Sequence, residues 1–295
     1  MVGLNPALQT VLQLSRISLG EVHRATSVNR MVSGKGFNTA KVLKRLGHEV
    51  HLLQILGGAN GQRCSDACDR VGLKSLAIWV AEETRQCITM LDEHSKTATE
   101  IIEPFKVTAD NLRRAIVALV AGELKSYDAM AVCGTIPEGI DPGVYGDLID
   151  QSENAKIIVD TWQGLNANEL SKSTCVKVNH LELKALENRL QGSAMQWKNV
   201  VLAITAGGGE AFLSKEGRIL VRYQPPPLPN FLNPIGAGDT VTAGLAHHLL
   251  QGLTIEESYR HALAMGSASC LHSNPAEYRD VDYQEIFTQM AVVNV

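Results

Sequence analysis

Short aliphatic runs alternate with segments of helical spacing along most of the chain. The runs predict the strands of a buried sheet, at residues 50–56, 129–132, 157–159, 176–178 and 200–204. Between them, apolar residues recur three positions apart, as at Ala40, Leu43 and Leu46 before the helix stop Gly47. This alternation predicts an α/β fold, a doubly wound, mostly parallel sheet flanked by helices.

Two regions depart from this alternation. Residues 85–91 and 97–102 are β-type runs joined by turn-forming residues, which indicates a hairpin. Residues 12–29 alternate weakly, as strands of modest burial do. Together these regions predict a separate small sheet, built from about residues 9–30 and 84–104.

The remaining segments predict shorter elements. Residues 1–6 predict a short first strand, and Thr108 is predicted to cap a helix that carries Leu112, Ile116 and Leu119. A second hairpin is predicted from residues 211–213 and 219–221. Further helices are predicted at residues 61–71, 142–149, 255–271 and 283–290, and another is predicted to start near Glu182.

Polar residues and glycines follow several of the predicted strands. They are Gly57-Gly58, Gly134-Thr135, Asp160, Asn179 and Thr205-Ala206-Gly207. Because ligands of open α/β sheets bind beyond the carboxyl ends of the strands, we expect these residues to converge on one edge.

The stretch Asn233-Pro234-Ile235-Gly236-Ala237-Gly238-Asp239 precedes a segment of helical spacing. Its glycines therefore lie at a helix N-terminus, where free amides and the helix dipole can hold an anion. Asp239 beside such an anion site suits a carboxylate that takes a proton from an attacking hydroxyl. The alternative is an ordinary tight turn with Asp239 as helix cap. Val241 excludes a dinucleotide-binding glycine loop, and no P-loop motif occurs.

Composition narrows the class of protein. The 295 residues are 45% hydrophobic and 20% charged, with a net charge of −4 and scattered basic residues, so we expect no nucleic-acid partner. No apolar run reaches membrane-spanning length and no signal peptide is recognisable, which favours a cytoplasmic protein without a membrane partner. The six cysteines stand in apolar segments without metal-ligand spacing, and we expect free thiols.

Two motifs resemble signatures of a known family. Ser33-Gly34-Lys35-Gly36-Phe37-Asn38 and the stretch 233–239 are similar to the N- and C-terminal signatures of the PfkB/ribokinase-like carbohydrate kinases. Segments between them resemble the 1-phosphofructokinase and tagatose-6-phosphate kinase branch, namely residues 84–85, 99–104, 134–139 and 177–182. The resemblance implies one ribokinase-like domain over residues 1–295, with ATP and Mg²⁺ as cofactors.

The resemblance also implies site residues. Asp239 matches the catalytic base, and the amides of Ile235, Gly236, Ala237 and Gly238 would form an anion hole. Asn179, Thr205 and Gly207, with Gly238, match nucleotide-contacting positions. Glu182 matches a residue near magnesium, in an indirect role.

The acceptor implied by the resemblance is a sugar that already carries a phosphate. Lys35, Arg85 and Arg24 match positions where phosphosugar kinases place cations, and we expect them to share one mouth. Gly34, Asn38 and Thr135 would meet the sugar. The small sheet resembles the family's lid, through which a homodimer could form.

Two departures affect these expectations. The family's sugar-binding aspartate is Gln9 here, with one acceptor oxygen and no charge. Glu210 replaces a glycine of the nucleotide segment. The resulting hypothesis is an ATP-dependent kinase that converts fructose 1-phosphate to fructose 1,6-bisphosphate. The alternatives are a tagatose-6-phosphate or fructose-6-phosphate kinase, and a non-catalytic regulator that binds a sugar phosphate.

Overall fold

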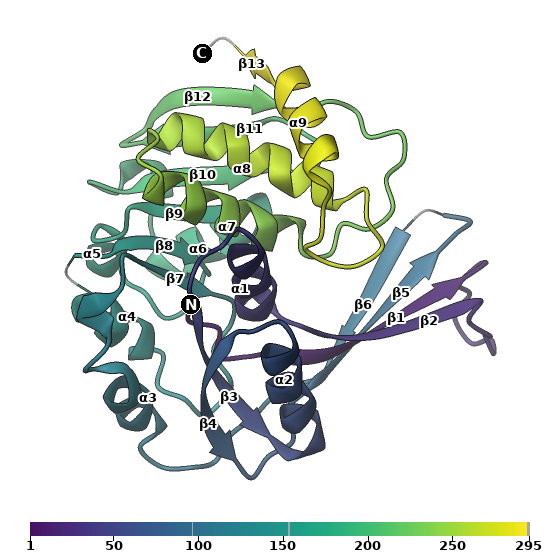
Figure 1. The fold of residues 1–295 in the computed structure, drawn as a ribbon, viewed down its shortest axis with the longest axis horizontal. Helices are drawn as coiled ribbons and strands as arrows, with labels where there is room; N and C mark the ends of the chain where they lie inside the picture. Colours follow the sequence, from purple (N-terminus) through teal and green to yellow (C-terminus); the bar gives the residue numbers. More distant parts are fainter. Residues whose placement is uncertain (96, 153, 294–295) are drawn as a thin grey trace.

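The computed structural model describes residues 1–95, 97–152 and 154–293, so Lys96 of the predicted 84–104 segment lies outside the described residues. A large sheet crosses the molecule (Figure 1), in the order β13-β12-β11-β10-β9-β8-β7. Its strands are β7 (Ala129–Cys133), β8 (Lys156–Asp160), β9 (Cys175–Asn179), β10 (Val201–Thr205), β11 (Ala211–Lys215), β12 (Arg218–Gln224) and β13 (Ala291–Val293). Strands β7 to β10 are parallel, whereas β11, β12 and β13 add antiparallel.

The predicted first strand is reduced to one residue. Val2 forms parallel bridges to Leu53 on one side and Val132 on the other. It thereby joins the parallel pair β3 (His51–Gly57) and β4 (Lys74–Val80) to the edge of β7. The next residue, Gly3, packs against Gly36, where an added Cβ would lie 2.5 Å from the opposing Cα. This close approach draws the start of α1 to the sheet edge.

Helices cover both faces of the sheet (Figure 1). The helices are α1 (Lys35–Arg45), α2 (Gly58–Arg70), α3 (Leu112–Val120), α4 (Val144–Asp150), α5 (Ala167–Leu170), α6 (His180–Leu190), α7 (Ala237–Leu250), α8 (Ile255–Ser269) and α9 (Asp280–Gln289). Alternating strand residues serve separate cores: Ile158 packs with α1, α7, α8 and α9, whereas Ile157 and Val159 pack with α3, α4 and α6.

A four-stranded sheet projects from this body (Figure 1), in the order β2-β1-β5-β6. Its strands are β1 (Ala7–Leu14), β2 (Ser27–Ser33), β5 (Gln86–Asp92) and β6 (Thr97–Ile102). Strand β1 pairs antiparallel with β2 and parallel with β5. Residues 15–26, for which strand character was predicted, instead connect β1 to β2 at the tip of the sheet (Figure 1).

The start of α3 differs from the prediction. The residue before the helix is Asn111 in the left-handed conformation, with φ 60°, while the Thr108 hydroxyl donates to Glu82 Oε1. Leu119 is 43% exposed, although Leu112 and Ile116 are buried as predicted. Thr108 therefore bonds to a side chain distant in sequence and does not cap the helix. The helix-capping preference of threonine does not reveal this contact.

Candidate active site

Asp239 lies in the first turn of α7 at the carboxyl edge of the parallel strands. Gly236 precedes the helix with φ 80°, and an added Cβ there would lie 2.7 Å from the amide nitrogen of Ala276. Glycine therefore allows both the left-handed turn and the close approach. Asp239 is 7% exposed, and its Oδ2 accepts a 2.7 Å hydrogen bond from Asn38 Nδ2. Asn38 thus holds the carboxylate, a contact beyond its predicted role toward the sugar.

The amides before Asp239 differ in availability. Those of Ile235 and Ala237, both predicted for the anion hole, already donate within the loop, to Asn233 Oδ1 and the Pro234 carbonyl. Within residues 1–95, 97–152 and 154–293 no acceptor is found for the amides of Gly236 and Gly238. Two of the four amides predicted for an anion hole are therefore used by the turn that forms the helix start, and two are left to donate to a ligand.

Asp160, at the end of β8, organises the charges beside Asp239. It is fully buried, and its Oδ1 accepts from Lys35 Nζ at 2.6 Å. Its Oδ2 accepts from Lys177 Nζ at 3.0 Å and from the Thr242 hydroxyl at 2.6 Å. Burial opposes ionisation of Asp160, but Lys177 and Lys35 outweigh it and lower its pKa. Asp160 was predicted at this edge without a role, and Lys177 was not predicted as a site residue, although a lysine inside an apolar strand is a recognisable signal.

The pKa of Asp239 moves the other way. Burial raises it to about 6, and the negative charge of Asp160 adds to this, against the opposing effects of Lys35 and Asn38. The helix N-terminus favours the ionised form of Asp239, whereas burial opposes it. A pKa near 6 still leaves Asp239 mostly deprotonated at pH 7, and brings it closer to the value that suits a general base.

A cavity of about 640 Å³ opens on one side of Asp239. Its lining includes polar residues and glycines, namely Gly238, Asn179, Glu182, Thr205 and Gly207. Its apolar lining includes Pro225, Pro226, Pro227, Leu228, Phe231 and Leu263. A cavity lined by both polar and apolar groups suits a nucleoside triphosphate, whose phosphates are charged and whose base is largely apolar.

Asn179 and Glu182 have a structural function as well. Asn179 is the N-cap of α6, where its side chain accepts from the Glu182 amide and Glu182 accepts from the Asn179 amide. The other carboxylate oxygen of Glu182 accepts from Lys35 Nζ at 2.5 Å. Glu210, the departure in the nucleotide segment, pairs with Arg222 on β12 and does not line the cavity.

A second cavity of about 170 Å³ lies where the four-stranded sheet meets the body. Gly34, Thr135, Arg85 and Lys35 line it, and Lys35 lines the larger cavity too. Among the described residues, Arg85 donates only to the carbonyls of Asn5 and Pro6, and burial lowers its pKa. A half-buried guanidinium without a carboxylate partner in the described chain suits an anionic ligand.

Asn5 adds an unsatisfied polar atom to the smaller cavity. Its Nδ2 donates to Thr135 Oγ1 at 2.9 Å, but its buried Oδ1 has no hydrogen-bond partner among the described residues. An unpaired buried amide oxygen is costly unless a ligand supplies a donor. Hydroxyl groups of a bound sugar would do so.

Two predicted residues lie apart from the cavities. Arg24 is exposed in the connection between β1 and β2, so it does not line the cavity that Lys35 and Arg85 line. Gln9 is buried in β1 and donates to Thr89 Oγ1 at 2.8 Å. The projecting sheet carries Arg24 away from the body, which sequence spacing does not reveal.

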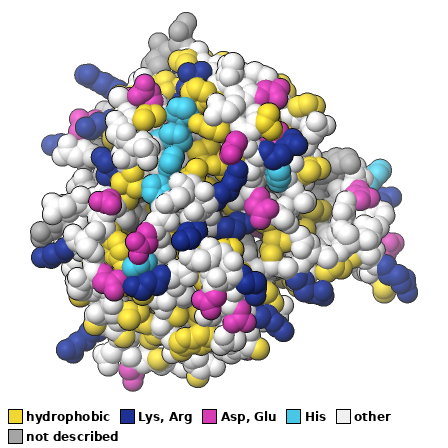
Figure 2. Space-filling view, in the orientation of Figure 1, with side chains coloured by type: hydrophobic (Ala, Val, Ile, Leu, Met, Phe, Trp, Pro, Cys, Tyr) yellow, Lys and Arg dark blue, Asp and Glu magenta, His cyan; other side chains and the backbone are white. Residues whose placement is uncertain are grey.

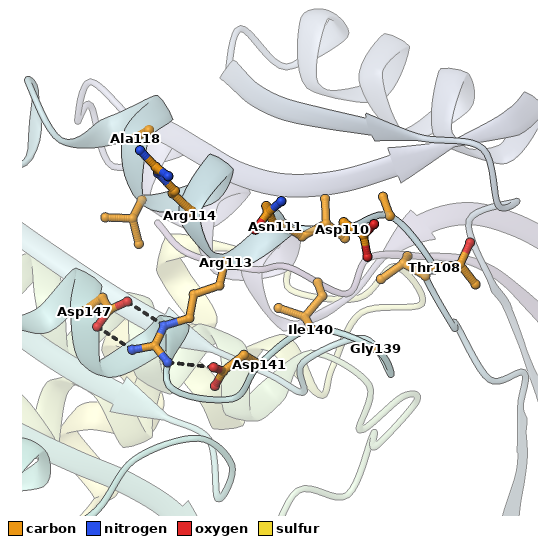
Figure 3. A pocket seen from close by; sticks show the side chains of 14 residues that line it. Thr108, Asp110, Asn111, Arg113, Arg114, Ala118, Gly139, Ile140, Asp141 and Asp147 are labelled. Atoms are coloured by element: carbon orange, nitrogen blue, oxygen red, sulfur yellow. Dashed lines mark hydrogen bonds and ion pairs between the residues drawn. The ribbon is translucent and has the colours of Figure 1, made fainter.

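Another cavity of about 640 Å³ lies beside α3 and α4 (Figure 3). Arg113 donates from Nε and Nη2 to Asp147, at 2.6 and 2.7 Å, and from Nη1 to Asp141 at 2.7 Å (Figure 3). These contacts neutralise the guanidinium, so it is not available to an anionic ligand. We therefore assign the site to the two cavities that meet at Lys35.

Comparison with known proteins agrees with this geometry. Residues 7–280 match the model of the pfkB family carbohydrate kinases. The chain belongs to the pfkB family. As a pfkB carbohydrate kinase it is a phosphotransferase that acts on an alcohol group, which confirms the predicted enzyme class.

Relatives span nearly the whole kinase. A tagatose-6-phosphate kinase of Staphylococcus epidermidis is 26% identical over 309 residues, covering 99% of this chain and 98% of the relative. A 1-phosphofructokinase of Haemophilus influenzae is 29% identical over 288 residues, or 92% and 91% of the two chains. The solved structure of Thermotoga maritima ribokinase matches with a TM-score of 0.77 at 19% identity over 98% of each chain. This likeness confirms the ribokinase-like fold.

The structure also bears on the remaining expectations. All six cysteines are buried and free, as predicted. Within the described residues, none of the kinase's helices combines the length and the apolar character that crossing a membrane would require.

Proposed function

We propose that this pfkB kinase transfers the terminal phosphoryl group of ATP to a hydroxymethyl group of fructose 1-phosphate, giving fructose 1,6-bisphosphate. The observation that carries the proposal is the junction of the two cavities at Lys35, with Asp239 beside it and the unpaired Arg85 in the smaller cavity. The Haemophilus influenzae relative, a 1-phosphofructokinase, supports this acceptor.

The chemistry follows from the residues at the junction. Asp239 accepts the proton of the attacking hydroxyl, while Asn38 keeps its carboxylate oriented through Oδ2. The amides of Gly236 and Gly238 donate to the transferring phosphoryl group. Lys35 and Lys177, both anchored by Asp160, bring positive charge to the phosphates without needing to reorganise during transfer.

Magnesium fits this arrangement as an ion carried mainly by ATP. Mg²⁺ usually keeps waters and phosphate ligands and needs only one or two protein carboxylates. Accordingly, no group of three His, Cys, Asp or Glu able to hold a metal occurs in the described part of the kinase. Glu182, beside Lys35 in the larger cavity, would hold the ion through water, and the bound ion would neutralise charge on the phosphates.

The smaller cavity provides for a phosphorylated acceptor. Arg85 would form a forked contact with the sugar phosphate. Thr135, Asn5 and Gly34 would meet the sugar hydroxyls. We also propose that the four-stranded sheet is a lid that excludes water, that two copies associate through it, and that the kinase is cytoplasmic.

A screen of acceptors tests the activity and the acceptor together. ADP release is measured with ATP, Mg²⁺ and, in turn, fructose 1-phosphate, fructose 6-phosphate, tagatose 6-phosphate and free fructose. We expect the highest kcat/KM with fructose 1-phosphate. Preference for tagatose 6-phosphate would favour the activity named for the Staphylococcus epidermidis relative. Sugar-phosphate binding without ADP release would instead show a non-catalytic regulator.

Replacing Asp239 by asparagine tests its role as the base. Asp239→Asn keeps an oxygen that can accept from Asn38, so the fold and sugar binding should persist, while kcat falls about 10³-fold. Calorimetric titration with fructose 1-phosphate measures the binding. The matched control is Asp66→Asn, an exposed aspartate on α2 that contacts only Gln62, and it should retain full turnover. A kcat for Asp239→Asn within tenfold of wild type would contradict the assignment.

A further inference from the structure

Three consecutive glycines contribute backbone to the larger cavity. Gly207, Gly208 and Gly209 come shortly after β10, and the first two line the cavity. Gly207 has φ 59°, and a Cβ added at Gly207 or Gly208 would meet no atom of the described residues within 4 Å. Glycine loses more conformational freedom on ordering than any other residue. A loop of this composition therefore binds a ligand weakly unless other groups hold it in place.

Strand β12 supplies two side chains that reach this glycine loop. Arg222 forms an ion pair with Glu210, the residue that follows the glycines. Gln224 lies two positions further along the strand and donates from Nε2 to the Gly208 carbonyl at 3.1 Å. Alternate residues of a strand share a face, so both side chains act from the same side of β12. The loop is thereby tied at two points to a strand of the large sheet.

The two side chains from β12 are themselves held in place. The guanidinium carbon of Arg222 lies 5.5 Å from the centre of the Phe212 ring, on the neighbouring strand β11. Gln224 Nε2 donates to the Pro225 carbonyl as well, also at 3.1 Å. Pro225 and Gly208 both line the larger cavity, so one amide group links two parts of its lining.

We propose that Glu210, Arg222 and Gln224 are positioning residues that hold the glycine loop in the conformation that binds ATP. This inference rests on the proposed function, since it concerns the cavity assigned to the phosphoryl donor. In the described structure none of the three side chains lines that cavity, so they act through the loop backbone. A loop that is already ordered loses less conformational entropy when the nucleotide binds, which raises the affinity.

The proposal gives a role to Glu210, which stands where the family resemblance implies a further glycine. Its carboxylate provides an attachment to Arg222 that a glycine lacks. Both side chains are about a third exposed, at 35% for Glu210 and 30% for Arg222, so water weakens their attraction. The ion pair therefore contributes little to overall stability, and its main effect is to restrict the loop.

Calorimetric titration with ATP and Mg²⁺, without sugar, tests the proposal together with steady-state kinetics. Glu210→Ala and Gln224→Met should each raise the Kd and the KM for ATP about fivefold, because the loop then has to be ordered by the nucleotide. The kcat and the KM for fructose 1-phosphate should stay within twofold, which a general loss of structure would not allow. The matched control is Arg218→Met, an exposed arginine of β12 without a carboxylate partner in the described chain, and it should change none of these constants.

A double-mutant cycle tests whether Glu210 and Arg222 act as one unit. Arg222→Met removes the charge but keeps an apolar side chain beside Phe212, and it should also raise the Kd for ATP about fivefold. Glu210→Ala combined with Arg222→Met should bind ATP within twofold of either single variant. Effects that multiply would overturn the role of the pair, as would an unchanged Kd in Glu210→Ala.

Hydrogen exchange measures the order of the loop directly. Without ATP, the amides of residues 207–209 should exchange faster in Glu210→Ala than in the wild-type protein or in Arg218→Met. Equal exchange rates in all three would contradict the proposal. Thermal unfolding of each variant shows that folded proteins are being compared.

The outcomes separate this proposal from the proposed function. Wild-type ADP release together with an unchanged Kd for ATP in Glu210→Ala, Arg222→Met and Gln224→Met would remove only the positioning roles. Absence of ADP release with every ketohexose phosphate would remove the proposed reaction, while the titrations with ATP would still decide the role of the loop. Failure of the wild-type protein to bind ATP would remove both.

Discussion

To serve as the proposed base, Asp239 has to remain able to take a proton while it lies buried next to another carboxylate. Burial and Asp160 raise its pKa to about 6, and Lys35, Asn38 and Lys177 limit the rise. Without these groups, a buried aspartate would become protonated and lose its use as a base. The balance among neighbouring charges therefore decides whether this single residue can act at neutral pH.

The pH dependence of kcat/KM follows from this balance. If Asp239 is the base, as proposed, its deprotonated form is the active one, so log kcat/KM should rise with pH, with slope about 1 below pH 6 and a plateau above. Values of kcat/KM measured between pH 4.5 and 8 define this acid limb of the profile. Asp160→Asn removes a negative charge that raises this pKa, so the limb should move to lower pH. A profile flat down to pH 5 would contradict Asp239 as the base.

At the scale of the element, α6 shows how one helix start can serve stability and function. Asn179 and Glu182 form a reciprocal capping box, and both line the larger cavity. Thr254 and Glu257 form the same motif at the start of α8, away from that cavity. The two caps therefore form a matched pair that separates a structural from a ligand-binding contribution.

Alanine at each cap should make this separation measurable. Asn179→Ala and Thr254→Ala should each lower the free energy of unfolding in urea by about 1 kcal/mol, because an N-cap acceptor is lost. Only Asn179→Ala should also raise the KM for ATP. Equal KM values in the two variants would show that Asn179 acts as a cap alone.

Elements with strong local signals were predictable from the sequence. The parallel strands β7 to β10 and the hairpin β5-β6 are confirmed because their apolar runs and turns are local features. The predictions of strand character for residues 15–26 and of a helix cap at Thr108 were wrong. Strand pairing and side-chain contacts between residues distant in sequence decide the conformation of these segments. In the site, strand-end position predicted Asn179 and Thr205, but no local pattern shows that Asp160 and Lys177 meet.

At the scale of the whole molecule, aromatic rings link the helices of one face. Histidine side chains form a row on the surface over α7 and α8 (Figure 2). His48 and His247 share a 2.8 Å hydrogen bond between ring nitrogens, and His261 stacks on His248 and Phe287 with centroids 4.4 and 4.0 Å apart. Burial, and then nearby positive charge, lowers the pKa of His247 and of His261 to about 4.

Acid should therefore loosen this face before the rest of the molecule. His247 and His261 are neutral when folded but become charged in the unfolded chain below about pH 6.5, so their contribution to stability is present above that pH and is lost toward pH 4. The urea concentration at the midpoint of unfolding should decrease as the pH is lowered from 7 to 5. His261→Phe keeps the stacking and should flatten this dependence, whereas His94→Gln, exposed at the tip of the four-stranded sheet, should not.

Among the described residues, Lys35 alone borders both cavities, and its ammonium group is already paired with both Asp160 and Glu182. Under the proposed function, the phosphates of ATP would compete for this ammonium group. Movement of the Lys35 ammonium away from Asp160 or Glu182 would then change the electrostatic potential in the smaller cavity. The binding of donor and acceptor should consequently be coupled. The factor by which ATP changes the affinity for the sugar phosphate must equal the factor by which the sugar phosphate changes the affinity for ATP. Under the proposed function, Lys35 would therefore make the affinity for each substrate depend on whether the other is bound.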